Sequence, residues 1–191
     1  MRKSRKLILA SASPRRQELL REAGISFEVF PAHIAEERKA GELPLDYARR
    51  LAEEKARAIA GRFPGRYVLG ADTIVVADEH VLEKPADHAD AARMLRMLSG
   101  RRHEVTTAVS LIRPAGHSDT RTCSTSVFFR TLSEEEIQQY VAGNEPMDKA
   151  GAYAIQGGAR VFADRMEGDY SNVVGLPLSL VTEMLRASGF C

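Results

Sequence analysis

The sequence predicts an α/β or α+β fold in which a β-sheet is flanked by helices. Segments typical of strands alternate with segments typical of helices along all 191 residues, and no internal repeat or low-complexity linker interrupts them. A long apolar run over 67–77 indicates a buried strand. Two segments rich in Thr, Val and Phe, 105–112 and 120–129, are separated by a Pro-Ala-Gly turn and indicate a long hairpin. The chain length and its 44% hydrophobic content suit an ordinary soluble domain or two closely associated lobes.

A short strand, a tight turn and a capped helix come first. Residues 7–10 are apolar and indicate a buried strand. Ser13 is a good N-cap, and Pro14 suits the first helical position because its missing N–H would have no partner there. The helix is expected to end at Gly24, and a second strand is expected over 25–30.

Two arginines occupy the first turn of this predicted helix. Arg15 and Arg16 lie where the helix dipole disfavours cations. Their presence suits an anion, with phosphate the obvious candidate, that docks against the guanidinium groups and the free N–H groups of the helix start. The alternative is a solvated basic helix start with no ligand.

The next helix is predicted over 44–60, with Pro44 at its start and Gly61 as its C-cap. Its apolar residues recur at helical spacing. Lys55 lies one turn from both Leu51 and Ile59, so it projects from the buried side of the helix. The alternative is that the Lys55 side chain runs past the edge of the core to reach water.

The later elements follow from local signals. Ser133 and Glu136 form the S-x-x-E pattern of a capping box, and the glycine-dotted segment 148–158 carries no regular pattern. The remaining predicted elements are a strand over 67–77, a turn at 78–80 with a return at 81–82, a helix over 87–98, a hairpin with strands 105–112 and 120–129, a helix from Ser133 to near Gly143, and a last helix over 178–187.

Asp72 is the sharpest chemical signal because it is the one charge inside the apolar run 67–77. Burying a carboxylate is costly unless it is paired or bound to a metal, and proteins often keep such a group for catalysis or ligation. The alternative is a strand end that reaches solvent. Glu36 and Glu37, in the loop after the second strand, could supply a second oxygen ligand or could simply be solvated.

Several classes of protein are disfavoured. The net charge of +1 gives no overall field toward nucleic acid or a membrane surface, so neither is expected as a partner. The apolar run after the basic segment 2–6 is too short for a signal peptide, and no stretch could span a bilayer. Cys123 and Cys191 form no metal spacing, which favours a reducing cytosol without a disulfide. No Walker A, G-x-G-x-x-G, G-x-S-x-G or zinc pattern is present.

What remains is a set of cations and carboxylates. The cations are the two early arginines, Lys55, Lys84 and Lys149, and the carboxylates are Asp72 and Glu36. Such a set suits hydrolysis of a nucleotide phosphoanhydride with Mg²⁺ or Mn²⁺. These residue types support the class of reaction but do not select the bond.

Five short motifs follow one another along nearly the whole chain. They are ASASPRR at 10–16, GADTIV at 70–75, EKP at 83–85, LSG at 98–100 and GLP at 175–177. Each motif alone is weak, but the combination in this order is specific. Together the motifs resemble those of the Maf family of nucleoside triphosphate pyrophosphatases.

The resemblance implies a single Maf-like catalytic domain over 1–191. Its fold would be a two-lobed α/β structure with a long mixed sheet, flanking helices and a central cleft, similar to inosine triphosphatase. Family members are cytosolic enzymes that cleave nucleoside triphosphates to the monophosphate and pyrophosphate with a divalent metal, here Mg²⁺ or Mn²⁺. They are often dimeric, which makes a second copy a candidate partner, and some are linked to inhibition of septum formation.

The resemblance also implies roles for individual residues. Asp72 matches the general base, and Asp72 with Glu36 would hold the metal. Three positions match those tied to substrate choice: Arg15, Thr73 and Gln156. Five positions match residues for phosphate and metal: Ser13, Arg16, Glu36, Lys55 and Lys84.

The segment 148–157 looks like the branch of the family that acts on dTTP and UTP. Two departures are Ala154, where that branch commonly has glycine, and Ala35, where an Asp often precedes the Glu. The expected function is therefore hydrolysis of dTTP and UTP, and of modified uridine triphosphates, in cleaning the nucleotide pool, with a link to arrest of cell division. The alternatives are a 7-methyl-GTP pyrophosphatase and a septum-formation regulator that binds nucleotide without significant turnover.

Overall fold

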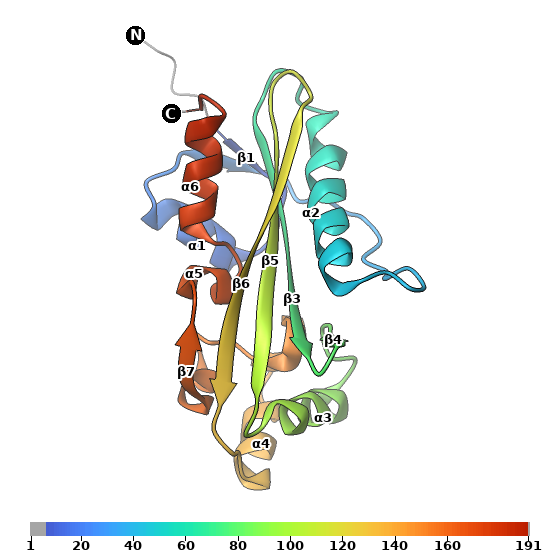
Figure 1. The fold of residues 1–191 in the computed structure, drawn as a ribbon, viewed down its shortest axis with the longest axis vertical. Coiled ribbons are helices and arrows are strands. Elements are labelled where there is room, and N and C mark those ends of the chain that lie inside the picture. The colour runs from blue at the N-terminus through green and yellow to red at the C-terminus, as the bar shows by residue number, and fades with distance from the viewer. Residues whose placement is uncertain (1–6, 191) are drawn as a thin grey trace. The chain divides into compact units, whose positions relative to one another are not determined.

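A computed structural model describes residues 7–190; the basic segment 2–6 and Cys191 lie outside the described residues. The fold is a mixed α/β arrangement (Figure 1). The strands are β1 (Leu7–Leu9), β2 (Phe27–Val29), β3 (Val68–Ala77), β4 (His80–Leu82), β5 (Arg102–Ile112), β6 (Ser118–Phe129) and β7 (Ala163–Glu167). The α-helices are α1 (Pro14–Glu22), α2 (Pro44–Ala60), α3 (His88–Leu98), α4 (Glu134–Val141), α5 (Tyr170–Val174) and α6 (Leu178–Ala187), and the 3₁₀ turns are η1 (Glu145–Asp148), η2 (Ala150–Ala152) and η3 (Gly158–Phe162).

The strands form one seven-stranded sheet in the order β2-β1-β3-β5-β6-β7, with β4 paired to β3. The chain divides into two compact units, in line with the two lobes expected. Unit 1 comprises 1–72, 107–123 and 175–191, and unit 2 comprises 73–106 and 124–174. Three strands contribute residues to both units, and the boundary within β3 falls between Asp72 and Thr73.

Unit 1 contains parallel strands, formed by β1, β2 and the start of β3, and α2 covers them. Strand β1 pairs in parallel with β2 and with β3, with Ile8 opposite Val68. The core on this sheet comprises Ile8, Ala10, Ala56, Ile59, Val68 and Ile112.

Gly70 brings β3 and α2 into close approach. A Cβ atom at Gly70 would lie 2.3 Å from the carbonyl oxygen of Ala52 and 2.7 Å from the backbone nitrogen of Ala56, so no side chain fits there. Side chains alternate along a strand, and Asp72 is two residues further on. Asp72 therefore lies on the same face of β3 as Gly70, the face that α2 covers.

Unit 2 has antiparallel pairing and an aromatic core. Strand β4 returns along β3, with Ala77 opposite His80, and β7 pairs with β6. The ring of His103 lies edge-on to Phe129 and to Tyr153, with ring centroids 4.8 and 5.4 Å away. These rings are almost fully buried and form the centre of the unit.

Most predicted elements are confirmed, among them α2 at the predicted bounds, the Ser13 cap and the capping box of α4. The prediction missed β7 and α5. Strand β7 reads Ala-Asp-Arg-Met-Glu, which has no β-branched or aromatic residue, and its strand conformation comes from pairing with β6. Among residues 7–190, no helix is both long enough and apolar enough to cross a lipid bilayer.

Candidate active site

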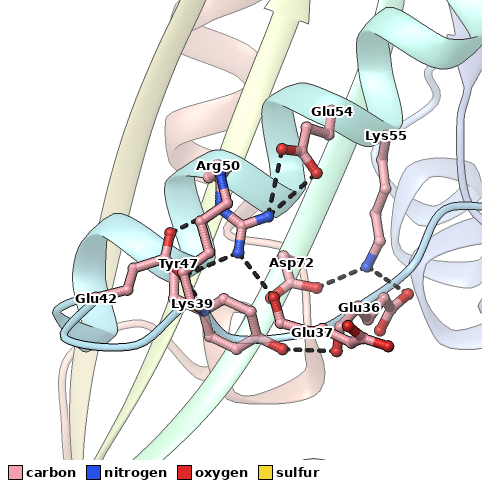
Figure 2. Close-up of polar contacts among 9 residues, drawn as sticks. All are labelled: Glu36, Glu37, Lys39, Glu42, Tyr47, Arg50, Glu54, Lys55 and Asp72. Carbon is pink, nitrogen blue, oxygen red and sulfur yellow. Dashed lines mark hydrogen bonds and ion pairs between the residues drawn. The ribbon is translucent and has the colours of Figure 1, made fainter.

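Three charged side chains of unit 1 meet at Lys55 (Figure 2). The ammonium Nζ lies 2.6 Å from Oδ1 of Asp72, on β3, and 2.9 Å from Oε1 of Glu36, in the loop after β2. The side chains of Lys55 and Asp72 are each 9% exposed, whereas that of Glu36 is 41% exposed. Lys55 thus projects from the buried side of α2, as predicted, and Asp72 is a paired carboxylate rather than a strand end in solvent.

The burial of Asp72 depends on this pairing. A carboxylate removed from water needs a nearby cation or hydrogen-bond donors, because its lost hydration is worth several kcal/mol. Lys55 supplies that cation through Oδ1, which leaves Oδ2 of Asp72 as the oxygen for a further partner. Glu36 is the exposed member of the cluster, so the cluster faces solvent on its side.

Arg16 cross-links three segments of unit 1. Its Nε donates to the carbonyl oxygen of Gly175 at 2.8 Å, and Nη1 donates to the carbonyl oxygen of Ala71 at 2.9 Å and to Oγ of Ser11 at 3.2 Å. Burial lowers the pKa of Arg16, and the charge of Asp72 opposes that shift. The sequence suggested either an anion ligand or a solvated cation at Arg16, but Nε and Nη1 bind the protein itself and fix the peptide just before Asp72.

The start of α1 has the predicted form. Oγ of Ser13 accepts a hydrogen bond from the backbone nitrogen of Arg16 at 3.4 Å, and the first turn of α1 holds no acidic residue. Arg15 is half-buried in that turn. The N-terminal end of α1 therefore has the cationic character expected of an anion site.

The other three predicted residues belong to unit 2. Thr73 is half-buried on β3, and as the neighbour of Asp72 it points to the opposite face of the strand. Lys84 is exposed and follows β4, just before the buried Pro85. Gln156 is exposed. The structure thus gathers Asp72, Lys55 and Glu36 into one cluster of unit 1 and assigns the other three to unit 2.

Gln156 lies at the tip of a turn that is fastened at both ends. At one end, the backbone nitrogen of Ala154 donates to the hydroxyl of Tyr140 at 3.0 Å. At the other end, the backbone nitrogen of Gly158 donates to Oε1 of Glu145 at 3.1 Å. The Tyr140 hydroxyl in turn donates to Oε1 of Glu145 at 3.2 Å, so one short chain of hydrogen bonds brackets Gln156.

No local pattern points to Tyr140 or Glu145, because each binds backbone groups more than ten residues away. Glu145 also explains why a glycine, Gly157, follows Gln156. A Cβ at Gly157 would lie 1.9 Å from Oε1 of Glu145, so any side chain there would displace the carboxylate.

The cluster offers a divalent metal two carboxylate groups. No group of three or more His, Cys, Asp or Glu residues able to hold a metal occurs in the part of the chain that the structure describes. Two carboxylates, from Asp72 and Glu36, do converge on a single cationic centre. This donor set fits Mg²⁺ or Mn²⁺, since such ions are often held by one or two carboxylates and complete their shell with water and phosphate oxygens.

The fold is shared with a group of known structures. The chain is similar to the Ham1 protein of Staphylococcus aureus, with 13% identity and a TM-score of 0.52 over 96% of this chain and 99% of that one. It is equally similar to a HAM1 protein from Coxiella burnetii, with 16% identity, a TM-score of 0.52 and the same coverage. These likenesses confirm the predicted α/β fold with its mixed sheet and flanking helices.

The sequence comparisons are more specific. Residues 6–188 match the profile of the family described as Maf-like protein. A dTTP/UTP pyrophosphatase of Koribacter versatilis (strain Ellin345) is 58% identical over 183 residues, covering 96% of this chain and 94% of that protein. A dTTP/UTP pyrophosphatase of Geobacter metallireducens (strain ATCC 53774 / DSM 7210 / GS-15) is 54% identical over 192 residues, covering 99% of each. The chain belongs to the Maf family.

Proposed function

We propose that this chain is a nucleoside triphosphate pyrophosphatase that hydrolyses dTTP and UTP to the monophosphate and pyrophosphate. The observation that carries the proposal is the buried Lys55–Asp72 pair with Glu36 at its exposed side. Relatives named dTTP/UTP pyrophosphatase, identical at more than half of the aligned positions over nearly their full lengths, supply the substrate class.

In this reaction a water molecule attacks the α-phosphorus, and the bond from that phosphorus to the bridging oxygen of the β-phosphate breaks. Asp72 orients the water and accepts its proton as the new P–O bond forms, and pyrophosphate leaves with the electron pair. Because Oδ1 of Asp72 is held by Lys55, Oδ2 is the oxygen that acts on water.

Cationic side chains stabilise the charge that develops on the phosphate oxygens. Lys55 neutralises the carboxylate cluster, and Arg16 contributes positive charge from its buried position. Arg15 and Lys84 bind triphosphate oxygens, and Ser13 closes the start of α1 where the anion docks.

Asp72 and Glu36 would hold Mg²⁺ or Mn²⁺. When bound, the cation supplies Lewis-acid polarisation of the phosphate oxygens and offsets their negative charge. Lys55 contacts both carboxylates in the structure, so it keeps their oxygens gathered at one point.

Gln156 reads the base, together with Arg15 and Thr73. Its amide offers one acceptor and two donors, which can pair with N3–H and O4 of uracil or thymine. Cytosine presents the reverse pattern, so an amide fixed by its turn rejects it. The turn held by Tyr140 and Glu145 supports this role because it fixes the backbone on both sides of Gln156.

The test is product analysis with UTP and either Mg²⁺ or Mn²⁺, followed by phosphorus NMR. UMP and pyrophosphate are expected, and metal chelation should abolish turnover. UDP and orthophosphate as primary products would contradict the proposal. A clear lead for 7-methyl-GTP in a substrate panel would overturn the assigned specificity, and nucleotide binding without turnover would favour a regulator. A single catalytic domain, pairing of two copies and a cytosolic location stay predictions from the resemblance.

A further inference from the structure

The loop that carries Glu36 is fastened to α2 by two side chains of that helix (Figure 2). The hydroxyl of Tyr47 donates to the carbonyl oxygen of Glu36 at 3.0 Å. Nη2 of Arg50 donates to the carbonyl oxygen of Glu37 at 2.9 Å. Tyr47 and Arg50 are three residues apart and share one face of α2, so two consecutive carbonyl groups of the loop are bound to one rigid element.

Arg50 is itself fixed by a bidentate ion pair. Its Nε lies 2.6 Å from Oε1 of Glu42, and its Nη2 lies 2.8 Å from Oε2 of the same residue. The side chains of Arg50 and Glu42 are 19% and 10% exposed, so this pair is shielded more than most surface ion pairs. The hydrogen bond from Arg50 lowers the pKa of Glu42 to about 2, so the pair stays ionised throughout the neutral range.

The far end of the loop folds back on the same pair. The backbone nitrogen of Lys39 donates to Oε2 of Glu42 at 3.0 Å, and Nε of Arg38 donates to the carbonyl oxygen of Glu42 at 2.9 Å. The segment 36–42 is therefore closed on itself through Glu42 and held to α2 through Arg50 and Tyr47.

We propose that Arg50, supported by Tyr47 and Glu42, is a positioning residue of the active site that holds the carboxylate of Glu36 beside Asp72. This inference rests on the proposed function, in which Glu36 is a ligand of the metal. Glu36 is the exposed member of its cluster and comes from a loop, so its side chain and backbone would lose much conformational freedom on meeting a cation. Arg50 orders the loop before the metal binds, so part of this loss of conformational freedom has already occurred. Arg50 and Lys55 lie on the same helix, so fixing the loop to Arg50 also places Glu36 within reach of Lys55.

The test compares Arg50→Met with Arg57→Met as its matched control. Arg57 lies on the same helix and pairs with Glu53 four residues away, but its side chain is 55% exposed and bonds to Glu53 and Ser118 instead of the loop. Mn²⁺ alone is titrated into the full-length, nucleotide-free protein and followed by electron paramagnetic resonance. Loss of a residue that orients a metal ligand is expected to weaken Mn²⁺ binding about 10-fold, with a similar fall in kcat/KM, and Arg57→Met should change neither.

Repeating the substitution in a Glu36→Gln background separates positioning from general stabilisation. If Arg50 acts through Glu36, Arg50→Met adds no further loss of Mn²⁺ affinity once the carboxylate is gone. Circular dichroism verifies that each variant is folded, and Tyr47→Phe should give a smaller change because it removes one hydrogen bond. An unchanged Mn²⁺ affinity in Arg50→Met, or an equal loss in both backgrounds, would overturn the proposal.

The Mn²⁺ titration also distinguishes this proposal from the proposed function. Dependence of metal affinity on Arg50 in a protein that cleaves no nucleotide would retain the positioning role and contradict the pyrophosphatase activity. If the protein is an active pyrophosphatase whose Mn²⁺ affinity does not change in Arg50→Met, the pyrophosphatase activity would be retained and the positioning role contradicted.

Discussion

The two units bury ionisable groups in opposite ways. Unit 1 buries Lys55 and Asp72 as a charged pair 2.6 Å apart. Unit 2 buries His103 and Tyr153 as neutral groups among aromatic rings, with Nε2 of His103 2.8 Å from the Tyr153 hydroxyl. Burial lowers the pKa of His103 to about 4 and raises the pKa of Tyr153.

The difference separates a reactive site from a core. A neutral histidine among rings behaves as an amphipathic core side chain, and its burial stabilises unit 2 like that of other aromatic groups. A buried ion pair gains little stability over apolar residues of the same size, so its presence calls for another reason. The proposed chemistry of Asp72 supplies that reason, and substitutions in the two units should fail in different ways.

The largest expected effect is that of Asp72→Asn. The amide keeps the shape of the side chain and leaves Lys55 paired with Glu36, so the protein should fold and bind UTP. Loss of the base should lower kcat by about 10²–10⁴, measured with saturating metal and UTP. A variant that keeps more than about a tenth of the wild-type kcat would remove Asp72 from the catalytic role.

Lys55→Met should mainly damage stability. The substitution leaves the carboxylate of Asp72 buried without its cation, which is expected to lower the free energy of unfolding by about 3–5 kcal/mol in urea denaturation. The double variant Lys55→Met with Asp72→Asn should recover most of that loss. A single variant that loses less than about 1 kcal/mol would mean that the pair is not the determinant of this burial.

Acid should destabilise the protein through His103. Its pKa falls from 6.5 in the free side chain to about 4 in the folded state, so between these values the unfolded chain binds more protons. The contribution of His103 to the free energy of unfolding should therefore have its full value above pH 6.5. It should decrease as the pH falls toward 4, by at most about 3 kcal/mol. His103→Gln should flatten this part of the profile, and an unchanged slope would assign the acid sensitivity to other groups.

The smallest effects are expected at the Gln156 turn, because it contributes selectivity and not chemistry. Gln156→Ala should lower the preference for UTP over CTP in kcat/KM by roughly 10-fold or more, in line with ~1–3 kcal/mol for a lost hydrogen bond in a buried complex. Its kcat for UTP should change much less. Equal preference in wild type and variant would remove Gln156 from base recognition.

Tyr140→Phe gives a finer test of the same turn. It deletes the hydroxyl that accepts from Ala154 and donates to Glu145, so the UTP preference should fall by roughly 3-fold. Tyr170→Phe, at an exposed tyrosine of the same unit, is the matched control and should leave the preference unchanged. A drop in thermal stability without a change in preference would give the hydroxyl a structural role alone.

Local signals predicted most of the fold. Pro44 and Gly61 bracket α2, and the S-x-x-E pattern at Ser133 marks the start of α4, because capping depends on residues that are neighbours in sequence. The same reasoning could not find strand β7, since most of its residues are exposed and its conformation depends on pairing with β6.

The sequence was enough to single out individual candidate residues of the site, but not to predict how they are arranged in space. A charge in an apolar run and a lysine on an apolar stripe single out Asp72 and Lys55. That they touch depends on the approach of α2 to β3, which no local pattern encodes. Arg16 shows the limit most clearly, because its partner Gly175 is 159 residues away, and that bond reassigns part of its role from ligand to framework.

Gly70 has a consequence for how this sequence tolerates change. The closeness of Lys55 to Asp72 depends on a missing side chain, since even one methyl group at Gly70 would collide with the backbone of Ala52 and Ala56. An added methyl would separate helix from strand and stretch the ion pair without touching any charged group. A mutational scan would therefore find Gly70 as intolerant of substitution as Asp72. Gly70 lies two residues before Asp72 and has no side chain that could take part in the chemistry.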